Sequence, residues 1–385
     1  MRRMMKADIR KTEAAADDLP VEESREKKPL ARLAQGGRAL RRRAGFYAGL
    51  FIVCMFYGMA IFAGTLAPYD YRAQSRREPL APPTVIRFRD AEGRWHMRPF
   101  IYARRLVDPL ARRYEEQTGR AYAIELFTRG HPYRLFGVWP TDLHLFGVRD
   151  GGEAGAPRIN LLGTDALGRD RWSRLLIASR FSLFVGPAGT LAASALGVLL
   201  GCIAGYARRS AGAVLMRAAD VMMALPVLVL ILAARAAFPL ELPPARAALL
   251  LILIFLAVGW AEMARLTRGL VIALRRREFV LAAESMGLSQ TRILFRHILP
   301  NASPALVVQV TLMLPAFLLA ETALSFLGVG LQEPEASWGS MLAAAADPSL
   351  LEEHAFVLLS PAFAIFLFVL GARLLSDGLK PKSAG

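Results

Sequence analysis

Six runs of apolar residues, each close to the length that crosses a bilayer, constrain what this chain can fold into. They occupy residues 46–63, 183–205, 220–238, 247–263, 305–326 and 356–374. A helix of about 20 mostly apolar residues spans the hydrocarbon core of a membrane. A hydrophobic fraction of 54% over 385 residues also argues against a soluble globular protein. The sequence therefore predicts an all-α polytopic membrane protein with six transmembrane helices.

Clusters of arginine and lysine flank these runs and predict their orientation. The clusters occupy residues 38–43, 208–209, 275–277 and 373–382. Short loops rich in Lys and Arg stay in the cytoplasm. All four clusters fall on one side of the predicted helices. We therefore expect a multi-pass protein of the bacterial inner membrane, with both termini in the cytoplasm.

The formal net charge of +16 raises the question of a nucleic-acid partner. A basic surface is the electrostatic footprint of phosphate binding. Here the arginines gather at the edges of the predicted membrane helices, where the orientation rule already explains them. We expect the lipid bilayer as a partner and no nucleic acid. Cys54 and Cys202 both lie inside predicted helices, so no disulfide framework is implied.

The chain divides into four segments by composition. Residues 1–37 mix acids and bases and predict a disordered cytoplasmic tail. Residues 38–66 hold the first transmembrane helix with its basic flank. Residues 67–160 predict a small periplasmic α+β insertion, and residues 161–385 a five-helix core with a cytoplasmic loop at 275–301.

The insertion shows three local patterns. The stretch TVIRFRDAEGRWHMRPF predicts a hairpin that turns at 90–93. Two copies of Leu-Phe-Gly-Val, at 135–138 and 145–148, predict extended pieces joined by a turn at 140–142. Between these patterns, ARRLVDPLARRYEEQTG predicts helix on both sides of Pro109.

Chemistry-bearing side chains are scattered through the insertion. A metal site would use His96, His131 and His144, but no cysteine or paired histidine spacing accompanies them, and we expect packed or surface histidines. A membrane-anchored enzyme would use the acidic residues Asp90, Glu92, Asp108, Glu115 and Glu116. Nothing in the sequence brings two of these carboxylates together, so we expect solvated surface acids.

The segment NLLGTDALGRDRWSRLLIASRFSL leads into the second predicted span. Gly163, Thr164 and Asp165 predict a tight turn, and Asp170 can cap the helix that follows. Apolar residues then recur at helical spacing from Trp172 onward. The pattern fits either an amphipathic helix at the outer membrane interface or a plain helix packed under the insertion.

The loop EFVLAAESMGLSQTRILFRHILPN, residues 278–301, predicts two short helices below the membrane. Gly287 suits a left-handed helix end, and Ser289 can cap the next helix. Phe279, Ala283 and Met286 share one face of the first helix by their spacing. No lipid can cover an apolar face at this place, so we expect it to bind a protein partner.

These residues resemble a known family. Ala282-Ala283, Gly287 and the run 297–301 look like the cytoplasmic signature loop of binding-protein-dependent ABC importer permeases of the dipeptide and oligopeptide group. Further pieces agree, namely GTDALGRDRWSRLL, MRAADVMMALP, ARLTRGLVIALRRREFV, ETALSFLGVG and SWGSML. The resemblance covers roughly residues 161–379 and the first span.

The resemblance implies a type I importer permease that carries peptides, paired with a second permease subunit in a heterodimer. Two ABC ATPase subunits would dock below, and a periplasmic substrate-binding protein would deliver from above. It implies no cofactor on this chain and ATP with magnesium on the ATPases, since no Gly-x-x-x-x-Gly-Lys-Ser/Thr loop occurs in the sequence. It assigns ATPase coupling to Phe279, Ala282, Ala283, Gly287, His297, Leu299, Pro300 and Asn301. Its periplasmic motif comprises Gly163, Thr164, Asp165, Gly168, Arg169 and Asp170.

The chain departs from the family pattern in two ways. Leu281 stands where the family usually has glutamate, so Glu278 or Glu284 would have to substitute. The insertion is longer than the connection common in the group and resembles the enlarged form of microcin C and long-oligopeptide permeases.

Two alternatives stay open at this point. One is the same importer class carrying nickel or another small solute. The other is an ion-coupled secondary transporter, whose path would be marked by intramembrane charges. The candidates for such charges are Asp220, which otherwise pairs with Arg217, and Arg235 and Glu262.

Overall fold

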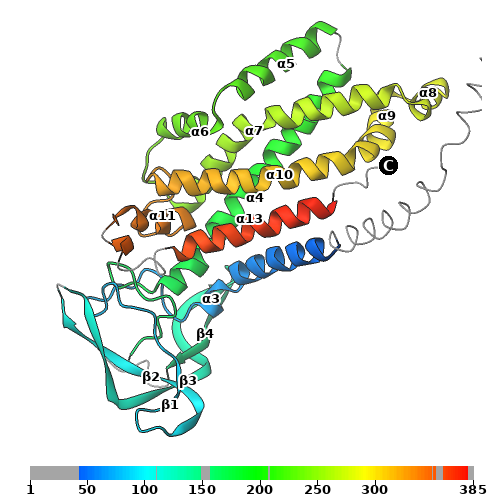
Figure 1. Cartoon of the computed structure of the whole chain (residues 1–385). Coiled ribbons are helices and arrows are strands. Elements are labelled where there is room, and N and C mark those ends of the chain that lie inside the picture. The colour runs from blue at the N-terminus through cyan, green and yellow to red at the C-terminus, as the bar shows by residue number, and fades with distance from the viewer. Residues whose placement is uncertain are drawn as a thin grey trace, which may run out of the picture.

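The protein is a bundle of long helices with a β-sheet insertion at one end (Figure 1). A computed structural model describes residues 43–109, 111–148, 157–206, 209–348, 350–352 and 359–379. The disordered tail predicted for residues 1–37 lies outside the described residues.

The helices follow the predicted apolar runs. The first helix is Arg43–Ile61, followed by α3 (Ala63–Leu66). The bundle continues with α4 (Arg171–Tyr206), α5 (Arg209–Ala224), α6 (Val227–Ala236), α7 (Pro244–Arg275), α10 (Leu299–Phe326) and α13 (Ser360–Leu379). Short elements lie between them: α8 (Glu278–Ser285), α9 (Gln290–Ile293), a π-helical turn η1 (Leu294–Ile298), α11 (Trp338–Ala343) and a 3₁₀ turn η2 (Ala344–Ala346).

Within the described residues, five helices are long and apolar enough to cross a membrane, and a bent pair brings the number to six. The pair is α5 with α6, bent by 89°. The break falls at Pro226, which has no backbone N–H to continue the helix. The six predicted spans are therefore confirmed by length and composition, with the third one broken. The side chain of Arg235 folds back from α6 and donates to the carbonyl oxygens of Phe238, Pro239 and Leu240 at 3.2, 2.9 and 3.1 Å.

Small residues let α4 approach α7 closely. A Cβ on Gly197 would lie 2.6 Å from Met263 Cβ, and one on Gly201 would lie 2.6 Å from the carbonyl oxygen of Ala264. Such small-residue contacts are the usual means by which membrane helices pack, because lipid supplies no hydrophobic force between them. The seam continues outward, where the stacked rings of Phe255 and Phe317 lie 4.8 Å apart and join α7 to α10.

The insertion is an antiparallel sheet in the order β1-β2-β3-β4. The strands are β1 (Arg87–Arg89), β2 (Trp95–Asp108), β3 (Arg113–Leu135) and β4 (Trp139–Val148). The predicted β1–β2 hairpin is confirmed, with Gly93 at a φ of +86°.

The helix predicted on both sides of Pro109 is wrong. The same residues form the ends of β2 and β3, where Arg104 lies opposite Glu116 and Arg105 opposite Glu115. Opposite charges across strands stabilise a sheet. The helical spacing of the apolar residues gave no indication of these cross-strand pairs. The described part of the insertion is thus β-sheet and loop rather than α+β.

The turn between the Leu-Phe-Gly-Val repeats lies at 136–138 rather than at the predicted 140–142. Gly137 has a φ of +75°, and Val138 N donates to the carbonyl oxygen of Leu135 at 3.1 Å. Pro140 and Thr141 belong to β4, opposite Arg134 and Tyr133.

Candidate functional site

The outer motif, residues 163–170, joins the insertion to the start of α4. Gly163 and Gly168 have φ values of +68° and +69°, which favour glycine. Thr164 bridges to Asp170, and its Oγ1 accepts from Ala81 N at 2.8 Å. Asp170 caps α4, since its Oδ2 accepts from Ser173 N at 2.8 Å. The predicted turn and cap are both confirmed.

An ion cluster fastens this motif to the loop that follows α10. Arg169 donates to Asp165 Oδ2 at 2.6 Å and to Glu333 Oε2 at 2.6 Å. Arg174 donates to Glu333 Oε1 at 3.0 Å. Both arginine side chains are buried, whereas the side chain of Glu333 is 55% exposed, so the cluster is open to solvent on the glutamate side. We call Asp165, Arg169, Arg174 and Glu333 the outer clasp.

The helix after the motif is continuous with the membrane span. The indole of Trp172 donates to the carbonyl oxygen of Leu66 at 3.1 Å, and Leu176 is buried against Ala63 and Ala67. The alternative of a plain helix packed under neighbouring elements therefore fits better than a free interfacial helix.

The three insertion histidines do not converge on one point. Among the described residues no group of three or more metal-binding side chains comes together. His144 is buried, with Nδ1 3.1 Å from the carbonyl oxygen of Gly64, and its ring stacks on His131 at 4.6 Å. Burial, and then the neighbouring His144, lower the pKa of His131. His96 instead contacts Asp90 Oδ2 at 3.0 Å.

The carboxylates considered for an enzyme also have ordinary partners. Asp90 binds Arg94 at 3.0 Å besides His96, and Glu116 accepts from Arg87 at 2.8 Å. The Asp108 carboxylate accepts from Ala111 N at 3.0 Å at the turn between β2 and β3. These contacts hold strands and turns together.

At the opposite end of the bundle, residues 278–301 form a helical hairpin. Gly287 has a φ of +77°, and Leu288 N donates to the carbonyl oxygen of Ala283 at 3.2 Å, which closes α8. The Ser289 hydroxyl accepts from Arg292 N at 3.4 Å and caps α9. Both predicted caps are confirmed.

The hairpin rests on a core shared with the membrane helices. Val280, Ala283, Ile293 and Ile298 are buried there together with Cys202 of α4 and Val271 of α7. Where α7 leads into the hairpin, Arg275 donates to the carbonyl oxygen of Gly205 in α4 at 3.1 Å. The hairpin is therefore packed on α4 and α7 rather than hanging from a flexible loop.

One part of the predicted hairpin face is wrong. Ala283, expected to share an uncovered face with Phe279 and Met286, is 1% exposed and packs inward. Met286 is 72% exposed, and the other large apolar side chains left open are Phe279, Leu281 and Phe295. We call these four residues the coupling surface. The exposed side chains of the hairpin are therefore apolar, as predicted, but Ala283 is buried beneath them.

The remaining residues of the family signature lie in two places. Ala282 in α8 and Gly287 just after it are exposed. His297 and Leu299, in and next to the π-helical turn, are half-buried, and Pro300 and Asn301 after them are exposed. Asn301 Nδ2 donates to the carbonyl oxygen of His297 at 2.6 Å. π-helical turns often occur at functional sites. Glu278 is exposed one turn before Leu281, whereas Glu284 accepts from Gln290 at 3.3 Å.

Polar side chains also occur within the membrane helices. Gln309 of α10 donates to Glu262 of α7 at 2.8 Å, and Arg265 pairs with Asp220 of α5. The pairing of Asp220 with Arg217 that we expected is replaced by this contact with Arg265. Glu262 and Gln309 line a cavity of about 490 Å³ that also exposes Met222, Met223 and Met313. Sequence reasoning identified Glu262 but missed Gln309, because their contact joins two separate helices.

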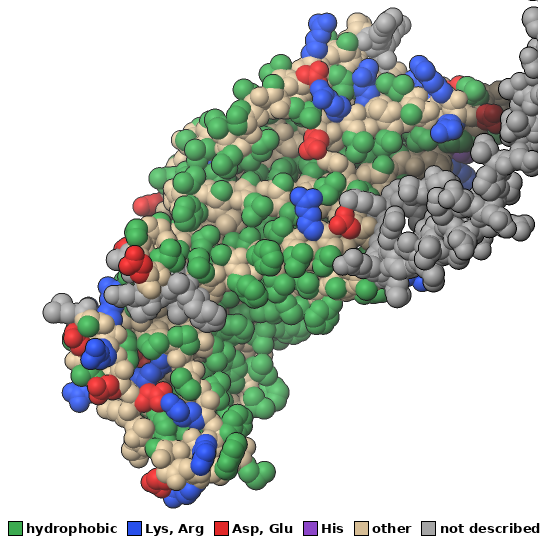
Figure 2. All heavy atoms as spheres, viewed as in Figure 1, with side chains coloured by type: hydrophobic (Ala, Val, Ile, Leu, Met, Phe, Trp, Pro, Cys, Tyr) green, Lys and Arg blue, Asp and Glu red, His purple; other side chains and the backbone are tan. Residues whose placement is uncertain are grey.

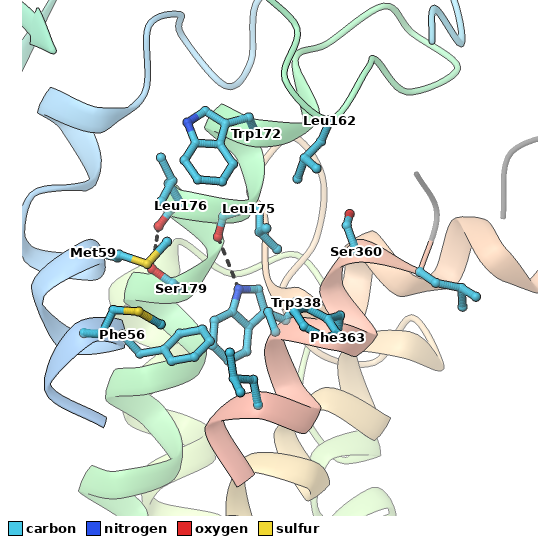
Figure 3. A pocket seen from close by; sticks show the side chains of 14 residues that line it. Phe56, Met59, Leu162, Trp172, Leu175, Leu176, Ser179, Trp338, Ser360 and Phe363 are labelled. Carbon is cyan, nitrogen blue, oxygen red and sulfur yellow. Dashed lines mark hydrogen bonds between the residues drawn. The ribbon is translucent and has the colours of Figure 1, made fainter. Parts of the chain in front are cut away.

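A second cavity, of about 600 Å³, lies between the first helix, α4, α11 and α13 (Figure 3). Its lining is almost wholly apolar. The indole of Trp338 donates to the carbonyl oxygen of Leu175 at 3.2 Å, and Ser179 donates to that of Leu176 at 2.6 Å. These polar groups are engaged within the chain, so the cavity is less suited than the first to a polar solute.

The fold and the hairpin define a polytopic membrane protein with exposed apolar side chains on a helical hairpin at one end of its bundle. Comparison with known proteins refines that class. The family model described as "Binding-protein-dependent transport system inner membrane component" matches residues 197–384. The N-terminal TM domain of oligopeptide transport permease C matches residues 33–83.

Individual relatives agree. The dipeptide transport system permease protein DppC of Bacillus subtilis is 38% identical over 218 residues, which are 57% of this chain and 66% of the relative. The oligopeptide transport system permease protein OppC of that species is 35% identical over 218 residues, 57% of this chain and 69% of the relative. The di/tripeptide permease DppC of Pseudomonas aeruginosa is 38% identical over 228 residues, 59% of this chain and 72% of the relative. A chain from the inward-facing MetNI methionine ABC transporter matches with a TM-score of 0.37 and 16% identity over 55% of this chain and 94% of that chain.

The chain belongs to the family of binding-protein-dependent transport system inner membrane components. It is a transporter subunit with several membrane-spanning helices, and the relatives do not favour an ion-coupled carrier or a membrane-anchored enzyme.

Proposed function

We propose that this chain is the transmembrane permease subunit of an ATP-driven importer that moves peptides across the inner membrane. The peptide assignment is supported by the names of the relatives, which are dipeptide and oligopeptide permeases. ATP and magnesium would bind to two separate ATPase subunits, and a periplasmic binding protein would deliver the substrate.

The observation that carries this proposal is the coupling surface. It is apolar and exposed, it lies on a hairpin with capped helices, and the hairpin shares a core with α4 and α7. Lipid cannot cover it if the basic clusters beside it are cytoplasmic. A protein that binds this surface and changes shape would bias the arrangement of the membrane helices. An ATPase subunit has that property.

The polar pairs within the membrane helices support a second permease subunit and a path for the substrate. Glu262 and Arg265 are exposed on one face of α7, beside the cavity of about 490 Å³. Charged side chains at this depth face water or another protein rather than lipid. We propose that a second permease subunit covers this face and that the cavity with Glu262 and Gln309 forms part of a path for a polar substrate.

Substitution of the coupling surface tests the proposal. Phe279→Asp and Met286→Asp place a charge on the exposed apolar surface, so we expect ATPase subunits to stop copurifying and peptide uptake to fall by at least about tenfold. Both side chains are exposed, so the thermal stability of the purified chain should not change. Thr291→Asp, an exposed polar position of the same hairpin, is the matched control and should retain uptake.

Normal uptake and normal copurification in both aspartate variants would overturn the assignment of this surface. Loss of uptake in Thr291→Asp as well would show that added charge, rather than the apolar surface, is responsible.

A further inference from the structure

The turn between β3 and β4 presents an exposed apolar tip. Phe136, Val138 and Trp139 point outward, with Val138 68% and Trp139 63% exposed. We call these three residues the β3–β4 tip. A Cβ added to Gly137 would meet nothing within 4 Å, so the turn is open at this position. Isolated soluble domains seldom expose such a cluster unless something binds it.

Contacts with the end of the first helix hold the tip in place. The Tyr133 hydroxyl lies 2.8 Å from Thr65 Oγ1 and donates to the carbonyl oxygen of Leu143 at 2.8 Å. The buried ring of His144 lies against Gly64, with Nδ1 3.1 Å from its carbonyl oxygen. Figure 1 shows β4 beside α3, with β1 farther from the bundle. The tip is therefore attached to the segment that leaves the membrane.

The place of the tip at the end of the first helix bears on its depth. The described part of that helix, Arg43–Ile61, comprises 19 residues, which span about 28 Å at 1.5 Å per residue. If this part spans the hydrocarbon core of roughly 30 Å, Phe62 lies near the outer boundary of that core. The ring of Phe136 packs edge-on against the ring of Phe62, with 5.7 Å between centroids. Phe136 must then lie at the same level.

The tip also continues an exposed apolar surface of the first helix. Ile61 and Phe62 are exposed at the end of the helix, next to the tip. Figure 2 shows hydrophobic side chains extending from the lower edge of the bundle onto the adjoining flank of the insertion. The tip sequence RLFGVW, residues 134–139, has an arginine and no acidic residue. Tryptophan and arginine are typical of the headgroup region of a bilayer.

We propose that the β3–β4 tip inserts into the outer headgroup and acyl boundary of the bilayer. Phe136 and Val138 enter the acyl edge, Trp139 lies at the headgroup level, and Arg134 faces lipid phosphates. The insertion is thereby a lipid-bound element whose sheet is held at a fixed tilt to the membrane. This role is separate from the import function and does not depend on which substrate is carried.

Spin labelling of the full-length chain in nanodiscs of phosphatidylethanolamine and phosphatidylglycerol tests the proposal. In a background with Cys54 and Cys202 replaced, a nitroxide is attached at Val138→Cys or at Met97→Cys. Met97 is exposed on β2, which does not pair with β4, and serves as the matched control. We expect the label at position 138 to collide several-fold more with oxygen and several-fold less with a water-soluble nickel chelate than the label at 97.

Equal nickel accessibility at both positions would place the tip in water and overturn the proposal. Protection at 138 from both oxygen and nickel would mean that protein covers the tip, which also overturns it. Lipids with brominated acyl chains give a second measurement with milder variants. Trp139→Phe should reduce the fraction of tryptophan fluorescence they quench, whereas Trp95→Phe should not; equal effects would contradict lipid contact.

Discussion

Asp170 has the most unusual environment of the outer motif. It is fully buried, and burial raises its pKa from 3.8 to about 6, although Ser173 acts in the opposite direction. Because the folded chain holds this proton more tightly than the unfolded chain, the Asp170 contribution to stability is greatest below about pH 4. It is lost as the pH rises to about 6.

Asp170→Asn should remove this dependence. We expect the difference in free energy of unfolding between the variant and the wild type to shift in favour of the variant between pH 4 and pH 7, by at most about 3 kcal/mol. Thermal unfolding in detergent across this range measures it. Glu92→Gln, at an exposed position, is the control. A constant difference for Asp170→Asn would mean that the carboxyl titrates normally in the fold.

Single residues were predictable from the sequence where their role is local. Gly287 and Ser289 close and cap neighbouring helices, so a few adjacent letters suffice to identify them. The burial of Ala283 was not predictable in this way, because the residues that cover it include Cys202 and Val271 of distant helices. The Gln309 contact with Glu262 was missed for the same reason.

Among the described helices, α4 and α7 share the most extensive contact. Gly201→Leu would drive a side chain into the Ala264 carbonyl and Thr267, and overpacking of this kind costs about 1–3 kcal/mol or more. We expect a marked loss of thermal stability and of monodisperse protein in detergent. Gly58→Leu is the matched control, since a Cβ on Gly58 meets nothing within 4 Å. Equal stability of the two variants would show that the seam tolerates separation.

Elements differ in how far sequence could predict them. The membrane helices follow from the length of the apolar runs alone, since backbone groups in lipid must be satisfied within the helix. The β-strands around Pro109 depend on pairing between Arg104 and Glu116 across a turn, and a helical pattern of apolar residues concealed that pairing. Pro226 can be read from the sequence, but the angle of 89° between α5 and α6 cannot.

For the whole molecule, the orientation of the chain is open to direct test. We expect both termini, and the hairpin that holds Ser289, in the cytoplasm and the insertion in the periplasm. Cysteines at Ala91 and Ser289, in a background without Cys54 and Cys202, report on the two sides, and both positions are exposed. An impermeant thiol reagent should label position 91 in intact spheroplasts and position 289 only after lysis. Labelling at 289 before lysis would invert the arrangement.

The outer clasp and the apolar core beneath the hairpin contact the same helices at opposite ends. Outside, Arg174 of α4 is tied to Glu333, which follows α10. Inside, Cys202 of α4 and Val271 of α7 share a core with Ile298, which precedes α10. Helices α4 and α10 are therefore joined at both ends, and we expect them to move together. A displacement of the hairpin by a bound protein would then be transmitted along both helices to Glu333 at the far end.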